Sequence, residues 1–229
     1  MHRHGGGRIF QRHGVREPIG EARRGQAAVG DDPMKQDARA LRLAIRQQRR
    51  DAPASERIAA AEALARRLLA LPCMPENGHV AGYWAVDGEI GLHAWQLRLP
   101  PGVIYCLPVL HDDLLRFAPW GPGGALVSNR YGIPEPDVAP GDLLDGNDMA
   151  LVVAPLVAFD AGCHRLGMGA GWYDRSFAFR RGRAAPPWLV GAAFASQQVE
   201  AVAAESWDVS MDAVCTERAT FLATPDAAE

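Results

Sequence analysis

Hydrophobic and polar residues alternate at helical spacing in the first ordered part of the chain. From Met34 to Ile45, apolar residues recur every three or four positions, which predicts an amphipathic helix. Pro53 interrupts this pattern, and Ser55 is a candidate N-cap for a second helix that ends near Pro72. The second helix is expected to bury Ile58, Ala61, Ala65, Leu68 and Leu69.

Short apolar runs after these helices predict the strands of a sheet. The predicted strands are 79–84, 103–109, 114–118 at an edge, 149–154, 188–195 and 211–215. The predicted helices between and after them are 92–99, an irregular helix at 172–181, and 196–204, while 119–141 is expected to be a long loop. Alternating strands and helices favour a three-layer α/β/α fold with a mostly parallel central sheet.

The first 33 residues differ from the rest because they show no hydrophobic periodicity. They are predicted to be a disordered or non-native N-terminal extension, with Met34 as a candidate natural start. Residues 34–229 are then expected to form a single α/β domain.

Composition narrows the class of protein without identifying it. The chain has 229 residues, of which 48% are hydrophobic, and its formal net charge is −3, which is typical of an ordinary globular protein. It contains no secretory signal and no apolar run long enough to cross a bilayer. Its cysteines are far apart and form no Cys-x-x-Cys pair, so we expect reduced thiols and a cytoplasmic protein.

Charge is unevenly distributed along the chain. Residues 1–75 hold 15 Lys or Arg against 8 Asp or Glu, so the remainder is acidic. Much of the excess is an arginine stripe on the first predicted helix, which we interpret mainly as a solvated face: Arg39, Arg42, Arg46 and Arg50. A basic arm invites a nucleic-acid interpretation, although ATP or a folate glutamate tail would match it equally well. The acidic remainder and the lack of interleaved aromatic and basic residues argue against nucleic acid.

A glycine-rich segment follows the predicted strand 149–154. Gly167, Gly169 and Gly171 alternate with other residues, Arg165 precedes them, and Asp174 follows. Such a loop allows a ligand to approach backbone N–H groups, while an arginine suits phosphate and a carboxylate suits magnesium. The spacing matches neither the dinucleotide fingerprint nor the Walker loop. A glycine-rich turn that serves only backbone geometry therefore remains the alternative.

The wider segment resembles the 5-formyltetrahydrofolate cyclo-ligase family, also called 5,10-methenyltetrahydrofolate synthetases. The main resemblance is carried by Pro155-Leu156-Val157-Ala158-Phe159-Asp160, Gly162, and Arg165-Leu166-Gly167-x-Gly169-x-Gly171-Trp172-Tyr173-Asp174-Arg175. Weaker matches extend it from about Leu41 to about Thr216: Leu41-Arg42, Asp87-Gly88-Glu89, Gly132-Ile133-x-Glu135-Pro136, Phe194 with Gln197, and Asp208-Val209-x-x-Asp212.

The resemblance implies a fold like those of NagB, RpiA and CoA transferase, together with a specific reaction. Such proteins use ATP and Mg²⁺ to convert 5-formyltetrahydrofolate to 5,10-methenyltetrahydrofolate, releasing ADP and phosphate. A formamide oxygen is a poor leaving group. Transfer of the γ-phosphoryl group to it gives an iminium phosphate, which N10 attacks as phosphate leaves. This chemistry depends on positioning and charge neutralisation. The implied protein is a monomer that acts on small molecules, without nucleic acid or membrane.

Site residues are also implied by the resemblance. Arg165 and Glu89 would be catalytic, with Glu89 hydrogen-bonding the pterin or positioning the formyl group. ATP would be bound by Arg42, Arg165, Leu166, Gly167, Met168, Gly169, Ala170, Gly171, Trp172 and Tyr173. The folate would contact Trp84, Glu89, Tyr131, Met168, Gly169, Ala170, Gly171 and Trp172. Asp174 and Asp208 would hold Mg²⁺.

Several positions depart from the family pattern or allow a simpler role. Ala38 stands where the family commonly has lysine, leaving Lys35 or Arg39 to supply that charge. Trp207 stands where a histidine often precedes the aspartate. Glu89 can also be interpreted as a surface turn acid, and Asp208 as a local cap. For the whole protein, the alternative is a non-catalytic module that senses a phosphorylated metabolite on the same scaffold.

Overall fold

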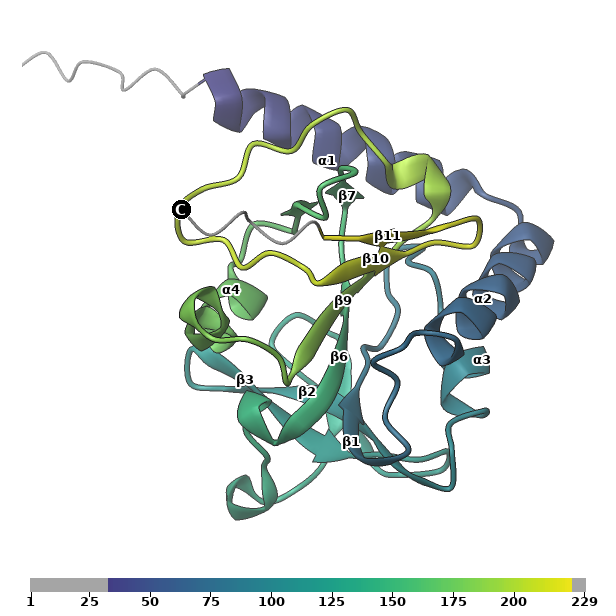
Figure 1. Ribbon diagram of the computed structural model, residues 1–229, viewed down its shortest axis with the longest axis vertical. Coiled ribbons are helices and arrows are strands. Elements are labelled where there is room, and N and C mark those ends of the chain that lie inside the picture. Colours follow the sequence, from purple (N-terminus) through teal and green to yellow (C-terminus); the bar gives the residue numbers. More distant parts are fainter. Residues whose placement is uncertain (1–32, 224–229) are drawn as a thin grey trace, which may run out of the picture. The chain divides into compact units, whose positions relative to one another are not determined.

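A computed structural model describes residues 33–223, with side chains from Asp37 onward (Figure 1). The prediction for the N-terminal extension falls, apart from Pro33, outside the described residues. The helices are α1 Pro33–Asp51, α2 Ala54–Leu69, α3 His93–Gln96 and α4 Trp172–Ser176, with 3-10 turns η1 Pro140–Asp142, η2 Gly146–Asp148, η3 Ala178–Gly182 and η4 Ala195–Gln197. The strands are β1 Asn77–Ala81, β2 Gly102–His111, β3 Leu114–Pro119, β4 Leu126–Ser128, β5 Pro134–Pro136, β6 Met149–Pro155, β7 Ala158–Phe159, β8 Arg165–Leu166, β9 Trp188–Ala192, β10 Ala213–Cys215 and β11 Thr220–Leu222.

Within the described range, a seven-stranded sheet runs in the order β11-β10-β9-β6-β1-β2-β3. β1, β2, β6, β9 and β10 are parallel to their neighbours in this group, whereas β3 and β11 are antiparallel edge strands. The predicted mostly parallel α/β sheet is confirmed. The long loop expected at 119–141 also contains a short hairpin formed by β4 and β5.

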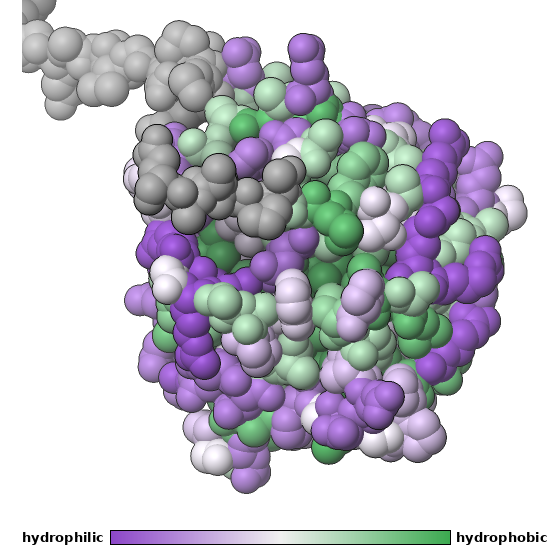
Figure 2. Space-filling view, in the orientation of Figure 1, coloured by the Kyte–Doolittle hydropathy of each residue, from purple (hydrophilic) through white to green (hydrophobic). Residues whose placement is uncertain are grey.

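Both faces of the sheet are buried, and successive residues of a strand pack on opposite faces. In β6, Leu151 and Val153 pack in the core cluster beneath α2, while Val152 and Ala154 pack in the cluster that contains Phe177. In Figure 1, α2 and α3 lie on one side of the sheet, and α4 with η3 lies on the other. Figure 2 shows that the side where α2 lies is mostly hydrophilic, with hydrophobic residues visible mainly towards the middle of this face.

The buried face of α2 differs from the predicted one at Ile58. This side chain is 67% exposed, and the buried residues are Ala60, Leu64, Ala65 and Leu68. Ile58 lies two positions before Ala60, which is about 200° away around a helix. The prediction that Ile58 is buried was therefore wrong. The predicted N-cap Ser55 lies inside α2, whose N-cap is Pro53.

The helix predicted at 196–204 is also absent, since only the short turn η4 forms there. Its backbone donors are used elsewhere: Val199 N–H donates to Phe159 O (2.8 Å) and Val202 N–H to Asp160 Oδ2 (3.0 Å). These bonds join the segment to the connection after β6. They replace the bonds to the fourth preceding carbonyl that a helix requires.

Gln197 holds this connection from inside the core. Its Nε2 donates to Leu156 O (2.9 Å) and Val157 O (2.8 Å), and its Oε1 accepts from Phe194 N–H (2.9 Å). Gln197→Leu would leave these buried backbone groups without partners. We expect it to lower the free energy of unfolding by about 3 kcal/mol in denaturant titrations. Gln198→Leu, at an exposed neighbouring position, should leave it nearly unchanged.

Candidate active site

The candidate site lies at the point where the order of strands in the sheet changes direction. From β1, the chain adds β2 and β3 on one side, then returns to β6 on the other and continues to β9 and β10. In parallel sheets, ligands bind at the carboxyl ends of the strands on either side of such a point. The turn with Glu89 follows β1, and the glycine-rich loop follows β6 through the short β7–β8 hairpin. The topology therefore brings together two segments that are about 80 residues apart.

The glycine-rich loop, residues 167–171, has the backbone that the sequence predicted. Gly169 (φ +95°) and Gly171 (φ +67°) adopt left-handed conformations that other residues rarely take. None of the backbone hydrogen bonds formed within residues 33–223 has an amide of residues 167–171 as its donor. These amides are therefore available to an anion. Since α4 has only five residues, we assign little of the attraction to a helix dipole.

Two arginines reach this loop from different parts of the chain. Arg42 of α1 donates through Nε to Gly167 O (2.8 Å). Arg165 is 6% exposed and donates through Nη2 to Asp174 Oδ1 (2.5 Å), while its guanidinium lies 5.7 Å from the centre of the Tyr173 ring. Arg39, by contrast, is exposed, and Lys35 lies among the residues without described side chains. Among the candidate phosphate ligands with described side chains, Arg42 and Arg165 contact the loop.

A cavity of about 420 Å³ opens beside the glycine-rich loop. Its wall includes Gly169, Ala170, Gly171, Asp174, Ala178, Arg175, Arg181 and Trp207. Its size is within the range of small-molecule sites. The cavity therefore combines loop amides, cationic side chains, a carboxylate and an indole.

The two candidate metal ligands are Asp174 and Asp208. Val209, which follows Asp208, donates its N–H to Asp174, but the two carboxylates have different hydrogen-bond partners. Asp174 Oδ1 accepts from Arg165 and from Val209 N–H (3.1 Å), whereas Asp208 Oδ2 accepts from Glu205 N–H (2.9 Å). In the contacts described for residues 33–223, each carboxylate keeps its other oxygen without a protein hydrogen bond. No group of three or more His, Cys, Asp or Glu in this range is arranged as metal ligands. Two carboxylates fit Mg²⁺, which takes its other ligands from water and phosphate.

Glu89 is held in the turn that follows β1. Its Oε2 accepts from Val86 N–H (3.0 Å), and its side chain is 9% exposed. Burial raises the pKa of Glu89, although the Val86 bond and the charge of Arg49 oppose this shift. Burial also raises the pKa of Tyr173, and the charge of Glu89 raises it further. The interpretation of Glu89 as a surface turn acid was therefore wrong.

The aromatic residues predicted to contact folate fall into two groups. Tyr131 and Trp172 meet edge to face, with ring centres 6.4 Å apart, and Met168, in the glycine-rich loop before Trp172, is 50% exposed. Trp84 instead meets Trp120 at 5.7 Å, against the core cluster beneath α2. The structure brings Tyr131 and Trp172 together, whereas Trp84 forms its aromatic pair with Trp120.

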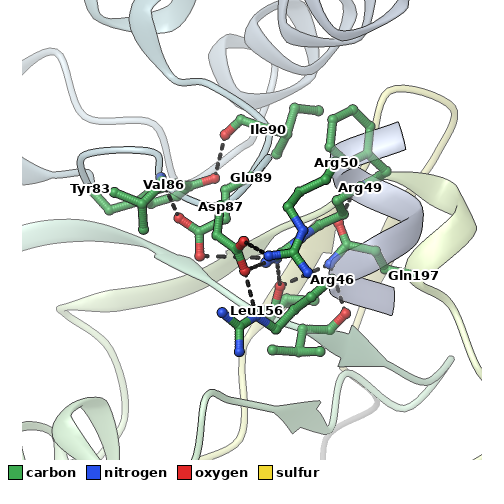
Figure 3. Close-up of polar contacts among 12 residues, drawn as sticks. Arg46, Arg49, Arg50, Tyr83, Val86, Asp87, Glu89, Ile90, Leu156 and Gln197 are labelled. Atoms are coloured by element: carbon green, nitrogen blue, oxygen red, sulfur yellow. Dashed lines mark hydrogen bonds and ion pairs between the residues drawn. The ribbon is translucent and has the colours of Figure 1, made fainter. Parts of the chain in front are cut away.

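Sequence reasoning missed a cluster in which α1 contacts the Glu89 turn (Figure 3). Asp87 forms ion pairs with three arginines of α1: Arg46, Arg49 and Arg50. Burial raises the pKa of Asp87, but the three cations together lower it by more, so the net shift is downwards. Arg46 and Arg50 are therefore not simply a solvated face. A detectable signal was the spacing of Arg46, Arg49 and Arg50, which places them on one side of a helix.

Comparison with known proteins identifies the family of this chain. The 5-formyltetrahydrofolate cyclo-ligase family model matches residues 34–217. The chain is 34% identical over 176 residues to the 5-formyltetrahydrofolate cyclo-ligase of Haemophilus influenzae, covering 75% of this chain and 92% of that protein. It is 34% identical over 176 residues to that of Escherichia coli K12, covering 75% and 96%.

Solved structures extend the likeness to the fold. The NMR structure of Aquifex aeolicus 5,10-methenyltetrahydrofolate synthetase superimposes with a TM-score of 0.70 at 25% identity, covering 84% of this chain and 95% of that one. These relatives favour an enzyme over the sensing module considered from sequence. By sequence and by structure, the chain belongs to the 5-formyltetrahydrofolate cyclo-ligase family of enzymes.

Proposed function

We propose that this chain uses ATP and Mg²⁺ to convert 5-formyltetrahydrofolate to 5,10-methenyltetrahydrofolate, releasing ADP and phosphate. The observation that carries the proposal is the loop 167–171, whose amides have no protein acceptor within residues 33–223 and which lies against Arg42 and a 420 Å³ cavity. Phosphoryl transfer needs groups that position phosphates and neutralise their charge, and this loop supplies them.

The reaction proceeds in two steps at adjoining parts of the site. The loop amides, Arg42 and Arg165 hold the triphosphate, and the γ-phosphoryl group passes to the formyl oxygen, forming the iminium phosphate and ADP. N10 then attacks the formyl carbon and releases its proton to solvent, and phosphate leaves with the former formyl oxygen. Glu89 holds the pterin through Oε1, which lies 4.0 Å from Arg49 Nη1 but accepts no hydrogen bond from the described residues, while Tyr131 and Trp172 form a wall against the flat ring. Binding beside ATP aligns the two reactants.

Magnesium fits a site between Asp174, which lines the cavity, and Asp208, which follows the lining residue Trp207. Asp174 and Asp208 would hold it through the oxygens that are free of protein hydrogen bonds within the described residues. Bound there, Mg²⁺ would neutralise charge that develops on the phosphates. Arg165 pairs with Asp174 and so can exchange this partner for phosphate when ATP binds.

The direct test uses purified protein, ATP, MgCl₂ and 5-formyltetrahydrofolate. Near-ultraviolet absorbance of the methenyl product should develop with ADP released in equal amount. Omitting ATP should abolish the change. Absence of ATP-dependent product formation by folded protein would reject the proposed function, and ATP hydrolysis without methenyl product would reject the assigned substrate.

A metal titration tests Asp174 separately. Asp174→Asn should raise the Mg²⁺ concentration needed for half-maximal turnover about tenfold, because an amide oxygen is a weaker ligand than a carboxylate. Asp212→Asn is the matched control, since Asp212 also pairs with a buried arginine, Arg180, but lies outside the proposed metal site. An unchanged Mg²⁺ requirement in Asp174→Asn, or an equal change in both variants, would contradict metal ligation by Asp174.

A further inference from the structure

Arg49 occupies an unusual position for a residue of a surface helix. Its side chain is 2% exposed, although Arg46 and Arg50 on the same helix are 32% and 48% exposed. Its Nη1 donates to Leu156 O (3.3 Å) and lies 4.0 Å from Glu89 Oε1, and its Nη2 lies 3.5 Å from Asp87 Oδ2. Figure 3 shows the guanidinium between the Glu89 turn and Leu156. Arg49 thus contacts the segments that follow β1 and β6.

Neutralising Asp87 does not account for the burial of Arg49. Arg46 donates to Asp87 Oδ2, and Arg50 donates to Oδ1 at 3.0 Å, so that carboxylate already has two cationic partners. Within the described residues, Nε and Nη2 of Arg49 are buried without a hydrogen-bond partner, which is costly for a guanidinium. A hydrophobic residue would fill the same space at lower cost. What distinguishes Arg49 is its simultaneous contact with Glu89 and Leu156.

The turn that carries Glu89 also depends on close contact with α1. Asp87 (φ +52°) and Gly88 (φ +75°) are both in left-handed conformations. A Cβ at Gly88 would lie 3.0 Å from the carbonyl carbon and oxygen of Arg49, so the turn lies directly against the backbone of α1. The same helix places Arg42 on the glycine-rich loop through Gly167 O. α1 therefore contacts both loops of the candidate site.

We propose that Arg49 is a positioning residue for catalysis, which links the segments that follow β1 and β6 and thereby holds the Glu89 carboxylate in place relative to the glycine-rich loop. The inference rests on the proposed function. Arg49 does not touch the reacting atoms; it acts through Glu89 and through the carbonyl of Leu156. Loss of the guanidinium should misplace the folate more than the nucleotide, since ATP is held mainly by the loop itself.

Other groups that face Glu89 define what a change at Arg49 can alter. They are Arg46 from α1, Asp87 from the same turn, Tyr83 after β1 and Tyr173 from α4. Unlike Arg46, Arg49 is a buried cation, and its charge favours the ionised carboxylate of Glu89. If ionised Glu89 accepts from the pterin, removing Arg49 should move the acidic limit of activity to higher pH. A lysine at this position should move that limit back towards the original pH.

The experiment compares three variants of the full chain: Arg49→Met, Arg49→Lys and the control Arg50→Met, which removes an exposed cation from the same Asp87. Steady-state rates of methenyl product formation are measured against 5-formyltetrahydrofolate, ATP and pH, and folded fractions are measured by thermal unfolding. Arg49→Met should lower kcat/KM for the folate about 10- to 100-fold, with the KM for ATP nearly unchanged. Arg49→Lys should recover part of this loss, and Arg50→Met should stay within about twofold of the original chain.

Each outcome decides the inference. A selective loss for folate, with a shifted acidic limit that lysine restores, supports it. Equal losses for folate and ATP, a loss explained by the unfolded fraction alone, or an Arg49→Met protein as active as Arg50→Met would overturn it. If Arg49→Met does not fold, Arg49→Lys decides, because undiminished folate kcat/KM in that variant would contradict dependence on the guanidinium. If the unmodified chain forms no methenyl product, the proposed function fails first and is distinguished from a failure of this inference.

Discussion

Arg165→Ala should reduce kcat about 10³-fold, the largest effect expected of any single side chain in the proposed phosphate site. Its guanidinium is buried against Tyr173 and reaches Asp174 at the edge of the cavity. Positive charge at this point would be most valuable when negative charge builds up on the phosphoryl group being transferred. Arg165→Lys should retain a charge but lose the planar, two-pronged contact, so its kcat should be intermediate. The measurement is kcat per folded molecule at saturating ATP.

The ion pair of Arg165 makes a stability control necessary. Alanine would leave Asp174 partly buried with only the N–H of Val209, which should lower the free energy of unfolding by about 1–3 kcal/mol. Arg180→Ala breaks a pair of similar burial with Asp212, where the arginine is 7% exposed compared with 6% for Arg165. It should lose at least as much stability, because Arg180 also donates to Pro187 O and Arg183 O, yet keep kcat. Similar kcat losses in both variants would indicate that the pair is structural and that Arg165 has no special role.

The glycine-rich loop was predictable because its information is local. Left-handed turns at Gly169 and Gly171 require glycine, and the residues on either side lie within a few positions of them. The strand that precedes the loop was equally predictable, since Met149–Pro155 is an almost continuous apolar run of the kind found in buried parallel strands. The resemblance to a family then placed Arg42 and Glu89 near the loop, although neither is close to it in sequence.

The contacts of Arg49 were not predictable in the same way. Helical periodicity separates polar from apolar faces, but it does not reveal that one of several neighbouring arginines lies beneath a turn 38 residues later. The failed helix at 196–204 has a similar cause. Its residues suit a helix, but Phe159 O and Asp160 Oδ2, about 40 residues away, accept from its backbone, and the Gln197 side chain donates to the carbonyls of Leu156 and Val157. Long-range hydrogen bonds decided both cases.

Glu89→Gln should lower kcat/KM for 5-formyltetrahydrofolate about 10²-fold while leaving the chain at least as stable at neutral pH. Glutamine keeps the size of the side chain but exchanges an anionic acceptor for a neutral amide. Val86 N–H and the nearby Arg49 both favour the ionised carboxylate, and Oε1 accepts no hydrogen bond from the residues that the structure describes. The ionised oxygen is thus the part of Glu89 best placed to accept from the pterin.

The sign of the pH dependence follows from the raised pKa of Glu89. As pH falls through that pKa, the carboxylate becomes protonated and ceases to accept, so activity should fall on the acidic side, and Glu89→Gln should lack this limb. Stability has the opposite trend: a carboxyl with a raised pKa in the folded state stabilises the fold below its unfolded pKa, and this contribution is lost as pH rises through the folded pKa. At neutral pH the fold therefore carries the cost of a buried carboxylate, which glutamine removes. A Glu89→Gln protein that is destabilised at neutral pH, or whose residual activity keeps the acidic limb, would assign Glu89 to the fold instead of the reaction.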